Sequence, residues 1–324
     1  MLKTVLVSQM DYKKLLNKLD TSLSSAEYHG MKGSFSSSQL KTMLEDPEVF
    51  YKKYITKTIA KEEIAAFDVG TYFHTAILEP HLLEKECVVY TDGIRSGKKW
   101  EEFKEKNAGK AIITAKEKET ADKIVQAVKD SPIAMSLLTK IKPEVSAFIE
   151  IYCTNDEIYC QKDGKWYQLL VVAGWVPCEL DEDELMGVTD FSTRLILKTR
   201  ADGLCVEDGF ILDLKSTQGN TKKDFEMSRK VADYQYDFSA ALYLDVFTMA
   251  SGKEIDKFYW IFASKDMGNS RTYLASQRNI MVGRAKWKKS ALDLAKYVAS
   301  NWEFSDSLGI LEPTAYNREW LEGV

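Results

Sequence analysis

Apolar and polar residues recur along this chain with two periods, one typical of helices and one typical of strands. Apolar residues return at helical spacing between residues 68 and 79, and Pro80 marks the end of this helix. Residues 144–152 alternate in the manner of a half-buried strand. Further helices are expected at 96–110, 115–131, 221–250 and 281–298, and further strands at 165–176 and 258–263. The chain therefore mixes helices and strands along its length.

The pattern carries most information between residues 200 and 217. Ile211, Leu212 and Leu214 make the second half of this stretch apolar, and residues 206–209 predict a turn between two short strands. Side chains alternate along a strand, so Asp213 and Lys215 are expected on the same face. The hairpin folds the preceding strand back and brings Asp202 close to that face.

Two carboxylates and an amine placed in this way can serve metal-dependent hydrolysis. Hard oxygen ligands suit Mg²⁺ or Mn²⁺, and an ammonium beside the ion can orient the attacking water or stabilise charge on a phosphate. The simpler interpretation is an ordinary ion pair between Asp213 and Lys215, since D-x-K occurs often by chance. The spacing back to Asp202 and the apolar setting of Asp213 favour the catalytic interpretation.

Composition narrows the class of protein. The 324 residues, 45% of them hydrophobic, are enough for a full core. The net charge is −5 and the isoelectric point is near 5.5, so any DNA contact needs a local basic patch rather than an overall positive field. No apolar run is long enough to span a bilayer. We therefore expect a soluble protein of the cytoplasm with no membrane partner.

The arrangement of the cysteines bears on two classes of metal site. The five are scattered and include no CxxC pair, which argues against a zinc ribbon or an iron–sulfur cluster.

Two regions depart from the regular pattern. Residues 1–33 contain an amphipathic stretch and a serine-rich link, and they predict an N-terminal appendage ahead of a domain over residues 34–324. Within that domain an insertion is expected around residues 153–195, where the strongly acidic stretch 178–191 predicts a loop.

His74 lies on the predicted helix 68–79 and is open to two interpretations. A lone histidine beside an apolar face is more often a hydrogen-bonded structural residue than a ligand. Gly70, one turn earlier, removes bulk and would suit the close approach of a neighbouring element. This observation raises the case for a functional role of His74.

The predicted helix 221–250 places Tyr236, Ser239 and Tyr243 on one face. Tyrosines at this spacing are most often semi-buried core residues with the hydroxyl at the edge. The cations of the predicted helix 281–298 could follow a phosphate backbone, but solvated surface is the usual role of such residues.

Four stretches, in order, resemble one family of nucleases. They are the serine-rich opening FSSSQLKTMLEDPEVFYKKY, the histidine stretch GTYFHTAILEP, the pair RADG and DLKST, and the tyrosine-rich YQYDFSAALY. Between about Ser34 and Ala263 the chain resembles the exodeoxyribonuclease VIII (RecE-type) group of the PD-(D/E)xK nucleases. That group is related to RecB-type nuclease domains and more distantly to lambda exonuclease.

The resemblance implies an α/β fold of the restriction-endonuclease-like type, in which helices flank a central mixed sheet. It implies that Lys215 positions the attacking water beside the catalytic carboxylates Asp202 and Asp213. It also implies a Mg²⁺ site, in which Mn²⁺ can substitute, whose ligands are His74, Asp202, Asp213, the backbone carbonyl of Leu214 and Glu144.

Expected DNA contacts lie around this site. Thr217 and Gln218 follow the lysine and could contact phosphate, while Arg200 precedes the site. The resemblance adds Tyr236, Ser239 and Tyr243, and the nearest further cations are Lys222, Lys223, Arg229 and Lys230. Relatives carry glutamine where Ser239 stands, so an amide contact is either missing or supplied from elsewhere, and Gln235 is one candidate.

By resemblance, the expected activity is 5′-to-3′ degradation of one strand from the ends of double-stranded DNA. The expected context is phage-type recombination, with a single-strand annealing protein as partner and a homo-oligomer as the active form. Two alternatives stay open. One is a structure-specific or single-strand endonuclease of the same fold, and the other is a DNA-end-binding module that has lost catalysis.

Overall fold

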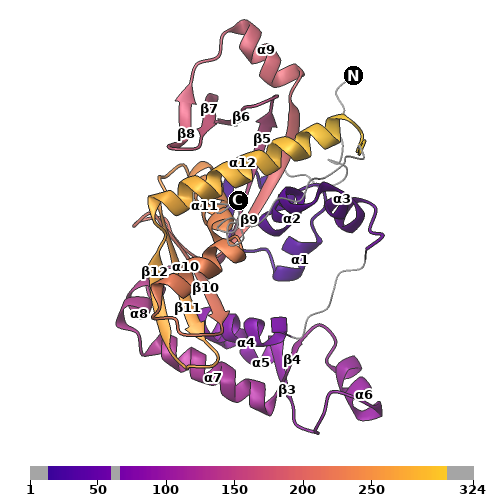
Figure 1. Cartoon of the computed structure of the whole chain (residues 1–324), viewed down its shortest axis with the longest axis vertical. Coiled ribbons are helices and arrows are strands. Elements are labelled where there is room, and N and C mark those ends of the chain that lie inside the picture. Colours follow the sequence, from indigo (N-terminus) through magenta and orange to yellow (C-terminus); the bar gives the residue numbers. More distant parts are fainter. Residues whose placement is uncertain (1–13, 60–65, 305–324) are drawn as a thin grey trace, which may run out of the picture.

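A large mixed β-sheet runs through the protein, for which a computed structural model describes residues 14–59 and 66–304. In this part of the chain the sheet has ten strands (Figure 1). Across the sheet they are β12 (Ser270–Leu274), β11 (Lys257–Ser264), β10 (Phe210–Thr217), β9 (Thr193–Cys205), β5 (Lys142–Cys153), β6 (Ile158–Lys162), β7 (Lys165–Leu170) and β8 (Gly174–Cys178), with β1 (Lys18–Asp20) on β5 and β2 (Phe35–Ser36) on β9.

The sheet combines parallel and antiparallel pairs. β10 and β11 run parallel, whereas β5, β9 and β10 form successive antiparallel pairs. The turn at residues 206–209 joins β9 to β10, as the sequence predicts. The predicted central mixed sheet flanked by helices is confirmed.

Helices cover both faces of the sheet, and β10 shows how its residues divide between them. Ile211 packs in the larger core with α11 (Tyr236–Ser251) and α12 (Gln277–Ala299). Leu212 and Leu214 point to the other core, which contains residues of α4 (Ala66–Leu78) and α7 (Ala115–Lys129). Asp213 and Lys215 therefore share the face of Ile211, because alternate side chains of a strand share one face.

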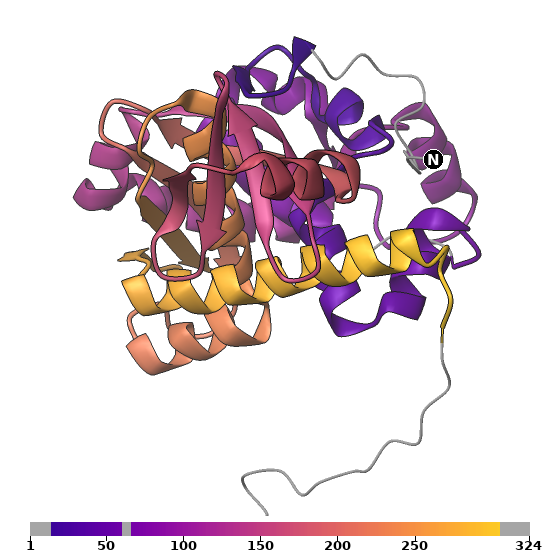
Figure 2. The same ribbon diagram turned by 90° about the horizontal axis from the view of Figure 1, so that it is seen from above.

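The long helix α12 crosses the sheet beside α11 and α2 (Ser37–Glu45), as Figure 2 shows. Gly283 allows the close approach of α12 to α11, since a Cβ there would lie 2.0 Å from the backbone oxygen of Asp237. The remaining helices are α1 (Ser25–Gly30), α3 (Pro47–Phe50), η2 (Tyr51–Ile55), η3 (Pro80–Leu82), α5 (Leu83–Glu86), α6 (Lys98–Lys106), α8 (Pro132–Leu138), α9 (Glu182–Asp190) and α10 (Asp224–Asp233), and a small parallel sheet pairs β3 (Cys87–Tyr90) with β4 (Ala111–Thr114).

Three predictions about these elements were wrong. The acidic stretch 178–191 contains helix α9 rather than a loop, because Asp181 and Glu184 form a capping box that begins a helix. Residues 165–176 form parts of two strands, β7 and β8, which pair as a hairpin. The helix expected over 221–250 is divided into α10 and α11 by Gln235, whose φ of 50° is left-handed.

Part of the predicted N-terminal appendage packs on the sheet. β1 pairs with β5, and Ser24 caps α1 through a capping box with Glu27. Residues 1–13 lie outside the described residues. Among residues 14–59 and 66–304, no helix combines the length and apolar character that crossing a membrane requires.

Candidate active site

Strands β9 and β10 separate shortly after their turn, and the predicted site lies where they part. Their ladder pairs Phe210, Ile211 and Leu212 with β9 and extends no further. Beyond it, the carboxylate of Asp202 accepts a hydrogen bond from the backbone N–H of Leu214 at 2.7 Å. The side chain of one strand thus replaces the missing backbone partner of the other.

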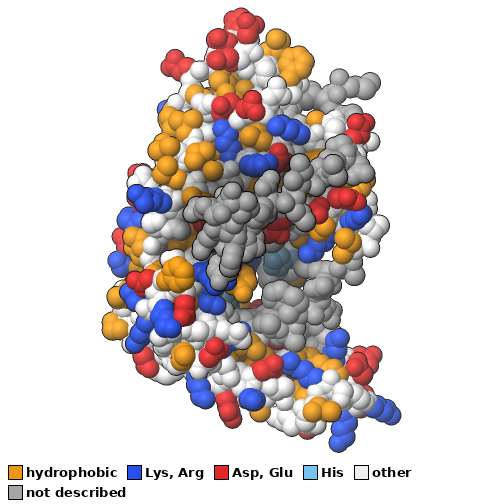
Figure 3. All heavy atoms as spheres, in the orientation of Figure 1, with side chains coloured by type: hydrophobic (Ala, Val, Ile, Leu, Met, Phe, Trp, Pro, Cys, Tyr) orange, Lys and Arg blue, Asp and Glu red, His pale blue; other side chains and the backbone are white. Residues whose placement is uncertain are grey.

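Three potential metal ligands converge beside this bond. His74 from α4, Glu144 from β5 and Asp202 from β9 offer ligand atoms that all lie within 4.8 Å of one another. The distance from Nδ1 of His74 to Oδ2 of Asp202 is 3.4 Å. On the face shown in Figure 3, basic and acidic side chains are interspersed over most of the visible surface.

The electrostatics of this cluster fit a bound cation. Burial raises the pKa of Asp202, and the charge of Asp213 raises it further, while His74 opposes the rise. Burial likewise raises the pKa of Glu144, with a contribution from Asp202. Two carboxylates that oppose each other's ionisation would be stabilised by a divalent ion, and their oxygens suit Mg²⁺ or Mn²⁺. The residues present therefore fit the metal that the fold class implies.

Glu144 is held in an unusual backbone conformation. Its φ is 53°, a left-handed value that a non-glycine residue adopts at a cost of about 1–3 kcal/mol. Nε of Arg200 donates to Oε2 of Glu144 at 2.5 Å, and Arg200 also donates to the backbone oxygen of Leu23. Arg200 therefore positions Glu144 and links the site to the segment before α1.

Asp213 and Lys215 form an ion pair on the face predicted for them. Nζ of Lys215 lies 2.6 Å from Oδ2 of Asp213. Burial acts to lower the pKa of Lys215, but the charges of Asp213 and Asp202 outweigh it and raise that pKa above its usual value. The lysine is thus a charged ammonium, and it lies 5.2 Å from the centre of the Tyr236 ring.

Lys41 on α2 belongs to the same group of charges and was not predicted. Its Nζ lies 5.8 Å from the centre of the Tyr236 ring, so two ammonium groups contact one tyrosine. Burial and the charge of Lys215 lower the pKa of Lys41 to about 8. Lys41 lies in the serine-rich opening that resembles the nuclease family, but no local pattern connects it to β10, which follows it by more than 150 residues.

Ser239 and Gln235 both contact α2. The hydroxyls of Ser239 and Ser37 lie 2.9 Å apart, and Nε2 of Gln235 donates to Oε1 of Glu45 at 2.5 Å. Both side chains therefore tie α11 to α2. Tyr243 packs against the larger core, where burial raises its pKa well above the usual value, so its surroundings are those of a semi-buried core tyrosine.

Other predicted contacts follow β10 in the sequence. Gln218 is exposed just past the end of β10, and Thr217 donates to its backbone oxygen. Lys223 and Arg229 form exposed ion pairs with Glu226 and Asp233. Four cations of the predicted helix 281–298, now in α12, are each paired with a carboxylate: Arg284 with Asp245, Lys286 with Asp237, Lys288 with Glu157 and Lys289 with Asp293.

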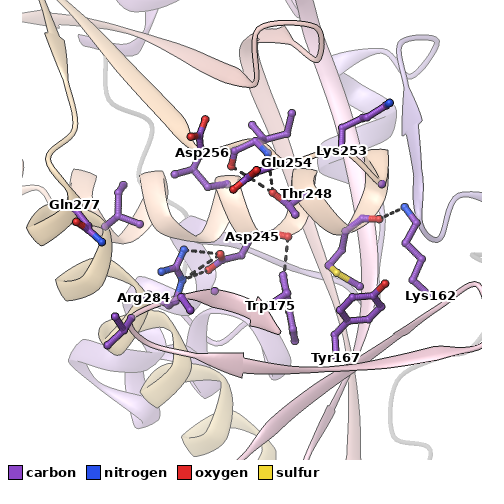
Figure 4. A pocket seen from close by; sticks show the side chains of 18 of the residues that line it. Lys162, Tyr167, Trp175, Asp245, Thr248, Lys253, Glu254, Asp256, Gln277 and Arg284 are labelled. Carbon is purple, nitrogen blue, oxygen red and sulfur yellow. Dashed lines mark hydrogen bonds and ion pairs between the residues drawn. The ribbon is translucent and has the colours of Figure 1, made fainter. Parts of the chain in front are cut away.

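A cavity of about 550 Å³ lies elsewhere, between the β7–β8 hairpin, α11 and α12 (Figure 4). Arg284 and Asp245 form a buried ion pair at its wall, and the indole of Trp175 donates to the backbone oxygen of Asp245. Apart from Arg284, none of the residues expected to contact metal or DNA lines this cavity.

Comparisons with known proteins concern the family and the fold. Residues 36–158 and 182–310 match the family described as a PDDEXK-like domain of unknown function (DUF3799). The match leaves out residues 159–181, which hold β7, β8 and most of β6. No curated protein matches the sequence.

A solved structure shares the fold. The crystal structure of a protein from Eubacterium rectale named "Putative exonuclease" superposes with a TM-score of 0.54 over 94% of this chain and 100% of that chain, at 13% sequence identity. At this identity the likeness concerns the fold alone. Since the family match spans most of the sequence, this chain belongs to the PDDEXK-like domain family.

Proposed function

We propose that this protein is a metal-dependent nuclease that hydrolyses phosphodiester bonds of DNA. The observation that carries the proposal is the meeting of His74, Glu144 and Asp202 beside the Asp213–Lys215 ion pair, where β9 and β10 separate. Convergent metal ligands next to a charged ammonium form an arrangement suited to stabilising the negative charge that develops on phosphate oxygens during hydrolysis.

Asp202, Glu144 and His74 would hold a Mg²⁺ ion, with Asp213 and the backbone carbonyl of Leu214 as further ligands and Mn²⁺ as a substitute. When bound, the ion supplies polarisation of the phosphate and a more acidic water. The bond from Leu214 fixes one oxygen of Asp202, and Arg200 fixes one oxygen of Glu144. These partners orient the carboxylates, as outer residues commonly do at metal sites.

Lys215 acts in this mechanism as a charged donor. Its ammonium orients the attacking water and stabilises the negative charge that develops on the phosphate. Asp213 holds the ammonium in place across 2.6 Å. Lys41 adds a second positive charge beside the Tyr236 ring, where it can hold the backbone of the bound strand.

The finer activity that we propose is 5′-to-3′ exonuclease action on the ends of linear double-stranded DNA. It rests on the resemblance of the four motifs to the exodeoxyribonuclease VIII group, and the name of the Eubacterium rectale protein favours an exonuclease. The proposal includes phage-type recombination or DNA processing in the cytoplasm, a single-strand annealing partner and a homo-oligomer.

One experiment tests these points together. Purified protein is incubated with linear duplex labelled at the 5′ end of either strand and with closed circular DNA, with Mg²⁺ or with EDTA. We expect Mg²⁺-dependent loss of the linear duplex, short 5′-labelled products and an intact circle. Cleavage of the circle would instead identify an endonuclease. DNA binding without any cleavage would identify a module that has lost catalysis. Lys215→Ala serves as the control for a contaminating nuclease.

A further inference from the structure

An exposed tyrosine stacks on the ring that contacts the active-site lysine. The rings of Tyr234 and Tyr236 lie 5.6 Å apart between centroids, with 23° between their planes. The Tyr236 ring in turn lies 5.2 Å from Nζ of Lys215. Tyr234 is 59% exposed. Tyr234 is therefore a solvent-exposed ring that is connected to the proposed catalytic ammonium through one intervening ring, that of Tyr236.

The backbone between the two tyrosines is shaped to hold this stack. Gln235 adopts φ 50° and ψ 44°, a left-handed conformation that costs a non-glycine residue about 1–2 kcal/mol. Its side-chain amide is bonded to Glu45. Nζ of Lys41 also donates to the backbone oxygen of Tyr234 at 3.2 Å. Two residues of α2 thus hold the break between α10 and α11, and the exposed ring is kept in a fixed position.

A fixed, exposed aromatic ring next to lysines is the combination that single-stranded nucleic acids recognise. Bases stack on such rings whatever their identity, because every base has an aromatic face, while nearby cations follow the backbone. Lys41 and Lys215 supply those cations here. A tyrosine with a purely structural role would gain stability from burial, which Tyr234 largely forgoes.

We propose that Tyr234 is a stacking platform for the terminal base of the bound strand. This inference rests on the proposed nuclease function and deepens it. It requires the substrate strand to enter with its terminal base unstacked from the duplex, and the platform accepts all four bases. Tyr234 is then a specificity-determining residue that distinguishes a strand with a terminal base from one without.

The test compares strands that differ only in the terminal base. Fluorescence anisotropy measures binding of a frayed-end duplex that carries either a normal nucleotide or an abasic one at the 5′ terminus, and a second pair carries the change at the 3′ terminus. EDTA is present, so the strands stay intact. Base stacking predicts that the wild type binds the normal end of one pair roughly five- to 150-fold more tightly. Tyr234→Ala is expected to remove this preference, and Tyr234→Phe to keep it.

Phe225 provides a matched control. It lies at the other end of α10, is 81% exposed and makes no ring contact with another described residue. We expect Phe225→Ala to keep the preference for the normal end. Equal binding of normal and abasic ends by the wild type, an undiminished preference in Tyr234→Ala, or the same loss in Phe225→Ala would each overturn the inference. Because the assay needs no cleavage, failure of the stacking proposal is distinguishable from failure of the nuclease proposal, which the Mg²⁺-dependent assay decides.

Discussion

The carboxylate of Asp202 accepts the backbone N–H of Leu214 at 2.7 Å, and this bond closes the place where β9 and β10 part. One side chain has two roles there. It satisfies a backbone donor of β10 where the two strands part, and it offers an oxygen to the same cluster as His74 and Glu144. These two roles can be separated by substitution.

Asp202→Asn is expected to abolish metal binding while the fold is kept. The amide oxygen can still accept the Leu214 N–H. The neutral amide also avoids the cost of burying a negative charge, which raises the pKa of Asp202. Titration calorimetry with Mn²⁺ should show binding in the wild type and none in the variant. The thermal midpoint without metal should equal or exceed that of the wild type. Asp202→Ala, which leaves the N–H unsatisfied, should lose about 1–3 kcal/mol of unfolding free energy.

Lys215→Met should reduce cleavage about 100- to 1,000-fold, the range seen when one donor to a developing anion is removed. Mn²⁺ binding should persist, because the ligands on β5, β9 and α4 are untouched. Single-turnover cleavage together with calorimetry checks both statements. Activity near that of the wild type would overturn the assignment of Lys215.

His74→Ala should weaken Mn²⁺ binding by more than about tenfold without unfolding the chain. The imidazole is one of three convergent ligands and is only partly buried. Calorimetry and a thermal transition distinguish ligand from structural residue, because a structural histidine would lower the midpoint and leave the metal affinity unchanged. His81→Ala, at an exposed position just past α4, is the matched control.

Lys41→Met should raise KM about tenfold and change kcat less, because the ammonium holds the bound strand rather than the reacting group. Steady-state cleavage of the labelled duplex gives both constants. Lys52→Met removes an equal charge from an exposed pair with Glu48 and should leave KM unchanged. A fall confined to kcat would place Lys41 in the chemical step instead.

Lys198 predicts a dependence of stability on pH. It is buried, donates to the backbone oxygens of Tyr28 and Met31, and burial lowers its pKa from 10.5 to about 8. Between these two values the unfolded chain holds more protons than the folded one, so the free energy of unfolding rises with pH in that window. Urea titrations should show the wild type gaining stability relative to Lys198→Met between pH 8 and about 10. A difference that stays constant with pH would contradict the assignment.

Local pattern was enough for several parts of the protein. Alternating residues and a turn at 206–209 determined the hairpin that carries Asp202, Asp213 and Lys215, because a strand's two-residue period decides which side chains share a face. Helical spacing determined the helix that presents His74. The resemblance of four ordered motifs anticipated the mixed sheet. The loop predicted from the acidic residues at 178–191 was wrong, because some of these residues begin a helix instead.

Contacts between distant segments decided the rest. Arg200 pairs with Glu144 from a neighbouring strand, Ser239 meets Ser37 across 202 positions of sequence, and Lys41 reaches the ring of Tyr236. The sequence by itself determined which residues carry charge and which faces of their elements they occupy, since these follow from local backbone geometry. Only the tertiary structure decided which of those charges meet, because packing of α2 and α4 against the separating strands depends on the whole core.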